Sequence, residues 1–367
     1  MWETKPRPKR ESSADLLAHI HQTAQAIGRA VQLMEVCGTH TVAAFRSGLR
    51  DLLPPSVSLI SGPGCPVCVT PPSYIDAAIE LSRRPGVTIA TFGDLVRVPG
   101  TFSSLEQERA AGADVRVVYS PMDAVAIARE DPTRRVVFLG VGFETTAPGI
   151  ALAVRSANGN MVDNFTVLSA LKTMPAPMRV LAAGEEVKVD GFICPGHVSV
   201  VTGASAFSFL AEEFGIPCVV AGFEDIDLLR GIDMLLAQIA EGRSRMEIEY
   251  SRAVRWEGSR AAQSVIAEVF EPCDTEWRGL GVIPDSGLKL RPQFAEHNAA
   301  SRFGVELTSR HTSVGCRCGD VLRGVLAPPE CPLFDSRCTP ATPMGPCMVS
   351  SEGSCAAFWR YGKRRRK

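Results

Sequence analysis

Long apolar runs are missing from this 367-residue chain. No run reaches the roughly 20 apolar residues that a membrane-spanning helix needs. The N-terminus, MWETKPRPKRESSADLL, lacks the apolar core of a secretory signal. We therefore expect a cytoplasmic protein without membrane contact. Thiols are kept reduced in that compartment, and structural disulfides are rare there.

An excess of one charge is missing as well. Lys and Arg number 39 against 40 Asp and Glu, so no broad electrostatic field attracts nucleic acid. Only residues 5–10 and 363–367 are basic, and solvated tails are the simpler interpretation of both. The glycine motifs G-x4-G-K-[ST] and G-x-G-x2-G between a strand and a helix are also missing, which argues against ATP, GTP and dinucleotides as ligands.

Cysteine, in contrast, is plentiful, with twelve residues in a chain that is 45% hydrophobic and 22% charged. That balance is typical of a globular protein, and the length allows two or three domains. In a reducing compartment, so many cysteines indicate metal ligation or thiol chemistry for at least some of them.

The chain pattern predicts an α/β protein with two parallel-sheet α/β domains and a C-terminal cysteine-rich iron–sulfur segment. Residues 13–30 have helical spacing, with Ser12 or Ser13 as the cap. Apolar, β-branched runs then alternate with helical stretches, as in parallel sheets covered on both faces. We expect an N-terminal helical segment (1–30), two α/β domains (31–130 and 131–250) and a cluster domain with a basic tail (251–367).

Six cysteines gather in the Pro- and Gly-rich stretch 310–358, which is too poor in periodic apolar residues to form a core: Cys316, Cys318, Cys331, Cys338, Cys347 and Cys355. A metal would supply the missing folding free energy. No C-x2-C knuckle of a zinc ribbon occurs among them. The C-x12-C-x6-C-x16-C spacing from Cys318 to Cys355 favours an iron–sulfur cubane over zinc or no metal. Spacing does not decide which four are ligands, and Cys316 and Cys347 could be bystanders.

Two further cysteine motifs follow predicted strands near the N-terminus. Cys65 and Cys68 in GPGCPVC have the spacing of a redox dithiol, which we favour over half of a zinc site. Cys37 begins CGTH, where a thiolate nucleophile or metal ligand, with His40 nearby, competes with an ordinary buried cysteine. Because ligands bind beyond the carboxyl ends of parallel strands, we expect these loops to converge on one cleft.

Other loops offer weaker candidates. Asp94 and Arg97 could belong to the site or form an internal ion pair, and Thr145 or Thr146 could simply cap a helix beside Glu144. His197 could act as a base or ligand, or make a plain hydrogen bond. Three cysteines are interpreted as structural: Cys194, Cys218 and Cys273.

Taken together, MEVCGTHT, SGPGCPVCVT, TFGDLVRVPG, GFETTAP, DGFICPGHVS and CTPATPMGPCMVSSEGSCAAFWRYG resemble the HypD family of hydrogenase maturation factors, over about residues 31–362. The resemblance implies assembly of the Fe(CN)2CO centre of [NiFe] hydrogenases. It also implies a HypC-type chaperone and a HypE-type cyanide donor as partners, and the hydrogenase large subunit as the eventual recipient.

The resemblance further implies site residues. Cys37 would bind the cargo iron, and Cys65 and Cys68 would be the dithiol. A [4Fe-4S] cluster would have as ligands Cys318, Cys331, Cys338 and Cys355. The residues His40, Asp94, Arg97, Glu144, Thr145 and His197 would line the cleft. The protein would be an assembly scaffold with thiol and iron–sulfur redox activity rather than an enzyme that converts a metabolite. The alternatives are a free-standing thiol-disulfide oxidoreductase and a zinc-stabilised binding module.

Overall fold

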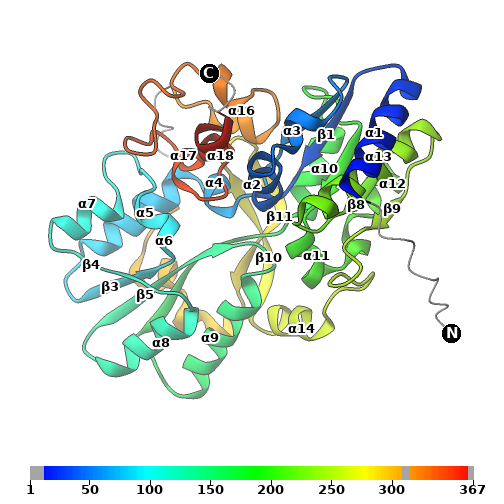
Figure 1. The fold of residues 1–367 in the computed structure, drawn as a ribbon. Coiled ribbons are helices and arrows are strands. Elements are labelled where there is room, and N and C mark those ends of the chain that lie inside the picture. The colour runs from blue at the N-terminus through cyan, green and yellow to red at the C-terminus, as the bar shows by residue number, and fades with distance from the viewer. Residues whose placement is uncertain (1–11, 308–314, 363–367) are drawn as a thin grey trace.

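Two sheets form the framework of the protein in the computed structural model, which describes residues 12–307 and 315–362 (Figure 1). The first sheet is parallel throughout, in the order β2 (Val57–Ser61), β1 (Val31–Glu35), β7 (Gly191–Cys194), β8 (Cys218–Val220) and β9 (Met246–Ile248). The second has the order β10 (Phe270–Trp277), β11 (Gly281–Leu290), β6 (Phe165–Lys172), β5 (Arg135–Gly142), β3 (Val87–Thr91) and β4 (Asp114–Val117). The predicted α/β class with mainly parallel sheets is confirmed.

Helices cover both sheets, and the sequence explains their ends. In α1 (Ser13–Ile27) the Ser12 hydroxyl accepts from Asp15 N, and Gly28 ends the helix at φ 68°. The other α-helices are α2 (Gly38–Arg46), α3 (Leu49–Leu52), α4 (Pro66–Val69), α5 (Pro72–Ser82), α6 (Gly93–Val96), α7 (Leu105–Ala110), α8 (Pro121–Glu130), α9 (Ala147–Gly159), α10 (Pro175–Ala183), α11 (Gly196–Thr202), α12 (Phe209–Glu212), α13 (Asp225–Ala240), α14 (Arg260–Val269), α15 (Ala299–Phe303), α16 (Cys318–Leu322), α17 (Pro346–Val349) and α18 (Ser354–Tyr361). A helix able to cross a bilayer is absent from the described part of the chain.

The chain visits each sheet twice. Strands β1 and β2 belong to the first sheet, β3 to β6 to the second, β7 to β9 to the first again, and β10 and β11 to the second. The boundary expected near residue 130 therefore does not separate the two sheets. The hairpin of β10 and β11, expected within the cluster segment, extends the second sheet through an antiparallel pairing with β6. Alternation along a sequence cannot show these crossings, because parallel strands pair with partners distant in the chain.

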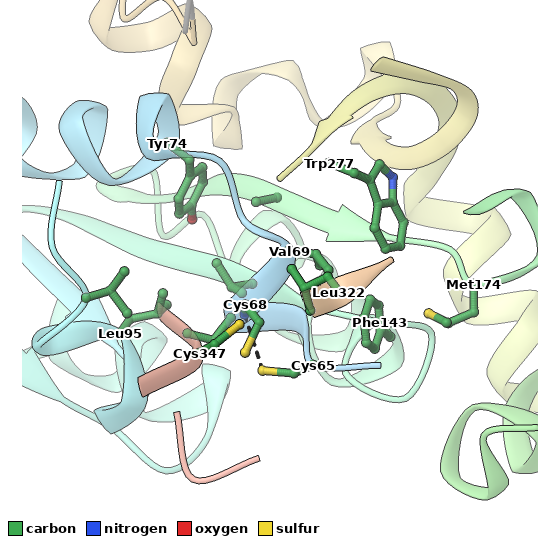
Figure 2. Packing of buried hydrophobic residues seen from close by; sticks show 14 of the residues in the cluster. Cys65, Cys68, Val69, Tyr74, Leu95, Phe143, Met174, Trp277, Leu322 and Cys347 are labelled. Carbon is green, nitrogen blue, oxygen red and sulfur yellow. Dashed lines mark hydrogen bonds between the residues drawn. The ribbon is translucent and has the colours of Figure 1, made fainter. Parts of the chain in front are cut away.

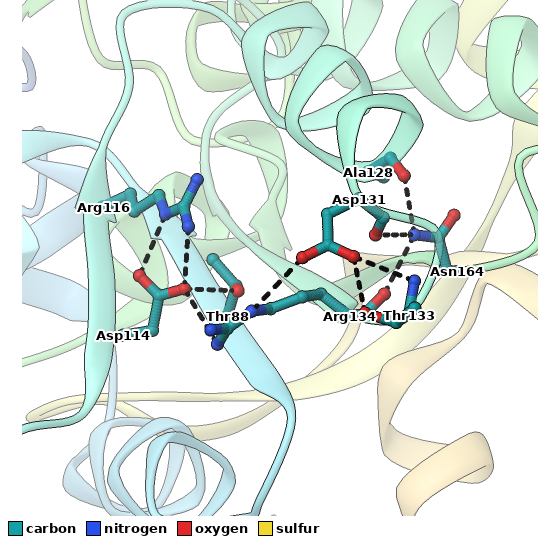
Figure 3. Close-up of polar contacts among 8 residues, drawn as sticks. All are labelled: Thr88, Asp114, Arg116, Ala128, Asp131, Thr133, Arg134 and Asn164. Carbon is teal, nitrogen blue, oxygen red and sulfur yellow. Dashed lines mark hydrogen bonds and ion pairs between the residues drawn. The ribbon is translucent and has the colours of Figure 1, made fainter.

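Polar contacts hold the far edge of the second sheet together (Figure 3). Asp114 of β4 accepts from the Thr88 hydroxyl at 2.7 Å and from the guanidinium groups of Arg116 and Arg134. The side-chain amide of Asn164 donates to three backbone oxygens before β5, one of them Ala128 O at 2.7 Å. These bonds hold β4 to β3, and they hold the segment before β5 to the residue before β6.

The cysteine-rich end of the chain folds back onto the N-terminal loops. Helix α18 packs on α2, where the rings of Phe45 and Phe358 lie 4.3 Å apart, and α16 and α17 contact α4. Figure 1 shows the last helices beside α2 and α4. Thiols more than 240 residues apart in the sequence are thereby brought together.

A buried lysine joins the hairpin to the second sheet. Lys172 ends β6 with no exposed surface, and its Nζ donates to Glu276 O at 2.6 Å and to Thr275 Oγ1 at 3.2 Å. The ammonium lies 5.2 Å from the centre of the Trp277 ring. Burial lowers the pKa of Lys172 to about 7.

Replacing Lys172 by Met should change how stability depends on pH. An unfolded lysine keeps its proton up to its ordinary pKa of 10.5, whereas folded Lys172 loses it near pH 7. The unfolded state therefore binds more protons between these values, and the free energy of unfolding of the natural chain should rise with pH relative to Lys172→Met. The slope is up to about 1.4 kcal/mol per pH unit. Urea unfolding under reducing conditions measures it, and parallel curves for the two proteins would contradict it.

Candidate thiol site between the two sheets

Cys37 opens onto a cavity at the carboxyl ends of both sheets. The cavity has a volume of ≈ 1070 Å³, including the part open to solvent. Its lining includes Cys37 after β1, Gly64 after β2, His197 after β7 and Thr145 after β5. Ligands of parallel sheets bind at this end of the strands, so the predicted convergence of the loops is present in the fold.

The Cys37 thiol is held in its protonated form. It is 7% exposed and occupies the N-cap position of α2. Burial, followed by the charge of the Glu352 carboxylate, raises the pKa of Cys37 to about 11. A bound cation would reverse both effects, because its charge stabilises the thiolate.

Two glycines let three segments meet at this point. A Cβ on Gly64 would lie 2.3 Å from Cys37 N, and a Cβ on Gly38 would lie 2.5 Å from Glu352 O. The amide of Gly38 donates to Gly64 O at 3.1 Å. Three segments are therefore in backbone contact: the CGTH loop, the loop 62–68 that carries Cys65 and Cys68 (the dithiol loop), and the turn before α18. Only residues without a side chain allow so close an approach.

Cys65 and Cys68 lie side by side in the dithiol loop (Figure 2). Cys65 caps α4, and Cys68 N donates to its sulfur at 3.2 Å. The Cys65 thiol donates to Ser350 Oγ at 3.3 Å. Both cysteines are buried, and burial raises the pKa of Cys68 well above its usual value. The two thiols thus differ, because only Cys65 has a hydroxyl partner.

All six C-terminal cysteines line one further cavity of ≈ 340 Å³, which they share with apolar side chains such as Leu333, Phe334 and Met348. Within the described ranges, no three histidine, cysteine or acidic side chains are arranged to hold a single metal ion. The six thiols are distributed around a space instead: Cys316, Cys318, Cys331, Cys338, Cys347 and Cys355. Thiols in an apolar wall are a donor set that fits an iron–sulfur cluster.

Cys347 connects the two groups of thiols. It is 1% exposed, and its thiol interacts with Cys68 on one side and with Cys318 and Cys355 on the other. Cys318 interacts in turn with Cys316. Figure 2 shows Cys347 beside Cys65 and Cys68, within the apolar surroundings of α4. Cys347, which lines the C-terminal cavity and interacts with Cys68, therefore connects the dithiol with that cavity.

The two histidines expected at the cleft are separated by an aromatic ring. Phe223 stacks on His197 at 3.8 Å and on His40 at 4.7 Å between ring centres. His197 lines the cavity, whereas His40 is fully buried behind Phe223 with Nε2 3.1 Å from Ala221 O. Burial lowers the pKa of His40 to about 4, so it is neutral at pH 7. His40 therefore orients the loop instead of lining the cavity, because α2 turns its side chain inward.

The acidic candidates also differ in position. Glu144 is buried, accepts from Met174 N at 2.9 Å, and has its pKa raised to about 7 by burial. It does not belong to the cavity wall, unlike its neighbour Thr145. Thr146 occupies the N-cap position of α9 without a side-chain cap bond.

Asp94 and Arg97 do not form the internal ion pair that was the alternative to a role in the site. The carboxylate of Asp94 accepts from Ser350 Oγ and Ser351 N, each at 3.1 Å. Arg97 donates to Pro340 O at 2.6 Å and lies 3.7 Å from Glu106. Both residues therefore bind acidic or polar groups outside their own loop, mainly in the C-terminal segment.

Sequence reasoning missed three residues of this site: Ser350, Glu352 and Phe223. The first two lie in the SSEGSC stretch, which was noted only for its cysteine. Their partners Asp94 and Thr39 lie more than 250 residues away in sequence, so no spacing rule connects them. Cys194 and Cys218, interpreted as structural, are fully buried in β7 and β8.

Comparison with known proteins gives a consistent picture. A family model described as "HypD: Hydrogenase formation hypA family" matches residues 11–362. The chain is 48% identical to the hydrogenase maturation factor HypD of Rhodobacter capsulatus, with 95% of this chain and 94% of that protein covered. It is 45% identical to HypD of Escherichia coli (strain K12), with 96% and 95% covered. A Rhizobium leguminosarum bv. viciae HypD is 49% identical, with 92% and 90% covered.

A methyl group on Gly64 should damage this site. Gly64→Ala forces the dithiol loop away from the backbone of Cys37, and we expect a loss of about 1–3 kcal/mol in the free energy of unfolding. Gly93→Ala is the matched control, because its Cβ would meet only Val117 at an ordinary 3.7 Å. Urea unfolding of both variants checks this. Equal stabilities would show that the loops are not in contact.

Proposed function

The chain belongs to the HypD family of hydrogenase maturation factors, and we propose that it assembles the Fe(CN)2CO unit of a [NiFe] hydrogenase in the cytoplasm. The work is done with a HypC-type chaperone, and cyanide comes from a HypE-type donor. The finished iron unit passes on to the hydrogenase large subunit. The observation that carries the proposal is the close backbone contact between Gly64, next to Cys65, and Cys37, whose thiol lines the cavity.

Cys37 is proposed as the protein's anchor for the cargo iron. Its thiol faces a cavity large enough for an iron with small diatomic ligands, at the meeting point of both sheets. Low-spin ferrous iron suits cyanide and CO, and a soft thiolate is a suitable third kind of ligand. Because burial and Glu352 keep the thiol protonated, the iron must displace the proton on binding.

Cys65 and Cys68 are proposed as the reductant of the cyanide donor. A thiocyanate-like donor R–S–C≡N plus the dithiol gives R–SH, cyanide, one proton and the Cys65–Cys68 disulfide. The carbon–sulfur bond is reduced by two electrons, and the two thiols lose two protons. The contact of Gly64 with Cys37 supports this assignment, because it holds the dithiol loop against the iron anchor.

The C-terminal cavity is proposed to hold a [4Fe-4S] cluster. Its donor set fits, since it offers thiols within an apolar wall. Cys331, Cys338 and Cys355 are three of the proposed ligands. Cys316 is proposed as the fourth in place of Cys318, because Cys338 interacts with Cys355 and Cys316, whereas Cys318 interacts with Cys347 and Cys316. When bound, such a cluster supplies electrons one at a time.

Between the dithiol and that cavity, Cys347 and Cys318 are proposed as a second thiol pair. A Cys347 thiolate can attack the Cys68 sulfur of a Cys65–Cys68 disulfide, after which Cys318 attacks Cys347 and releases Cys68. The disulfide then lies between Cys347 and Cys318, and the first pair is reduced. The interactions of Cys347 with both neighbours support this exchange.

Cys37→Ala should abolish hydrogenase maturation while leaving the other thiols in place. We expect infrared bands of cyanide and CO on the protein purified with its small partner, and their loss in the variant. Cys273→Ala is the control, because Cys273 lies half-buried in β10, away from both cavities. Maturation that survives Cys37→Ala would refute iron binding by this thiol, while a simple oxidoreductase would keep its dithiol activity.

Two variants, Cys316→Ala and Cys318→Ala, should show which of these cysteines is a cluster ligand and which takes part in disulfide exchange. After anaerobic preparation, Cys316→Ala is expected to lose iron and visible absorbance. Cys318→Ala is expected to keep both and to lose re-reduction of the Cys65–Cys68 disulfide. Iron analysis and absorption spectra measure the first property, and thiol labelling the second.

The reverse result would make Cys318 the ligand, as the resemblance implied. A colourless protein that contains zinc in place of iron would refute the cluster altogether.

A further inference from the structure

A hydrogen-bonded path leads from the buried dithiol to a surface carboxylate. The Cys65 thiol, which is 3% exposed, donates to Ser350 Oγ at 3.3 Å. The Ser350 hydroxyl donates to Asp94 Oδ2 at 3.1 Å. Asp94 is partly exposed at the start of α6. The Ser350 hydroxyl therefore connects a sulfur that is shielded from water with a carboxylate that water can reach.

We propose that Asp94 accepts the Cys65 proton through Ser350 when the dithiol reacts, and returns it when the disulfide is reduced. The proposal rests on the proposed function of the Cys65/Cys68 pair and adds the route of its proton. Ser350 and Asp94 act through Cys65, and neither touches the substrate.

The direction of the hydrogen bonds fits this task. Sulfur donates to the hydroxyl, and the hydroxyl donates to the carboxylate, so two short proton shifts place one proton on Asp94. The sulfur left behind accepts from Cys68 N at 3.2 Å, a bond that favours the thiolate. A positioned carboxylate is an ordinary general base, and a bridging hydroxyl extends its reach.

Cys68 has no such hydroxyl and carboxylate path among the hydrogen bonds of the described residues. Burial raises its pKa well above the usual value, and its thiol interacts with the sulfurs of Cys65 and Cys347. Because only Cys65 has a hydroxyl partner, Cys65 is assigned the attack on the substrate, and Cys68, next to Cys347, closes the disulfide.

The proton balance of the reductive step then divides between two routes. In the cleavage of R–S–C≡N, the S–H bond of Cys65 breaks and its proton goes to Asp94 by way of Ser350. The Cys65 sulfur attacks the sulfur of R–S–C≡N, so that a Cys65–S–S–R bond forms as the S–C bond breaks. The S–H bond of Cys68 breaks as the Cys65–Cys68 bond forms, and this proton goes to the leaving R–S⁻. The carbon takes the electron pair of its bond to sulfur and leaves as cyanide, which balances the proton held by Asp94.

The charges around Asp94 leave it available as a base. Arg97 on the same helix is directed to Pro340 O and Glu106, and Glu352 from the C-terminal turn accepts from the Thr39 hydroxyl. Within residues 12–307 and 315–362, Asp94 forms no ion pair. Its other hydrogen bonds come from Ser351, through N at 3.1 Å and Oγ at 3.0 Å.

The same bonds could serve only to pin the 350–352 turn, and the variants must distinguish the two roles. Asp94→Asn keeps an oxygen that accepts from Ser351 but cannot take a proton. Ser350→Ala removes the bridge, and Ser350→Thr retains a hydroxyl. Ser351→Ala is the matched control, because it removes a bond to the same carboxylate oxygen and leaves the path from Cys65 intact.

The measurement is the rate at which iodoacetamide alkylates Cys65 in the reduced, full-length protein with its metal content preserved. Alkylation forms one S–C bond, breaks one S–H bond and releases iodide, so it reports loss of the thiol proton. Mass spectrometry of the Cys65 peptide gives the rate between about pH 6 and pH 9. Circular dichroism confirms that each variant is folded.

We expect Asp94→Asn and Ser350→Ala to react roughly tenfold more slowly than the natural protein near pH 7, a modest share of general-base catalysis. The difference should vanish at high pH, where hydroxide removes the proton directly. Ser350→Thr should restore the rate, and Ser351→Ala should match the natural protein across the range. A rate loss of the same size at every pH, or shared by Ser351→Ala, would overturn the proposal and leave a purely structural bond.

Failure of this path is distinguishable from failure of the proposed function. Alkylation is measured on the protein alone and needs no cyanide donor or hydrogenase. Should Cys65→Ser support full maturation, the dithiol role fails, whatever the alkylation profile. Suppose that Asp94→Asn has the alkylation profile of the natural protein and that Cys65→Ser loses maturation. The redox role of the dithiol would then stand, and Asp94 would be excluded as its proton acceptor.

Discussion

The contact of the 350–353 turn with the two N-terminal loops is the constraint on which the site depends. Gly38 and Gly64 have no room for a Cβ because backbone atoms of Glu352 and Cys37 occupy it. This contact connects the strand ends of the first sheet with the cysteine-rich end of the chain.

Much of this arrangement follows from the sequence. Apolar runs after residue 31 identified the strands, and GPGCPVC and CGTH were expected after strands at one edge, where they lie. The assignment of strands to sheets did not follow, because β1 pairs with β7, some 160 residues later, and local pattern carries no information on such pairing. Cys347 was open as a bystander because spacing counts residues and cannot show that its thiol lies between Cys68 and Cys318.

Burial imposes one electrostatic condition on the sulfurs. In surroundings of low polarity the charged thiolate is disfavoured, which raises the pKa of Cys37 to about 11 and raises the pKa of Cys68 well above its usual value. Buried thiols in this state are unreactive until something removes or replaces the proton. Iron can do so at Cys37, since a cation compensates for the lost solvation. At the dithiol, the hydrogen bonds from Cys65 to Ser350 and from Ser350 to Asp94 offer a base for this proton.

The burial of these thiols also bears on the polar turn 350–352, which lies close to them. The serines at 350 and 351 and the acid at 352 lie between two buried cysteines, Cys347 and Cys355, where apolar residues would pack more simply. Ser350 is buried and Glu352 is partly buried, whereas Ser351 is exposed, and burying a polar side chain costs free energy unless it finds a partner. Here each does, since Ser350 and Ser351 bind Asp94 and Glu352 binds Thr39. The Ser350 hydroxyl contacts both a thiol and a carboxylate, which is the arrangement that the proposed transfer of a proton from buried sulfur requires.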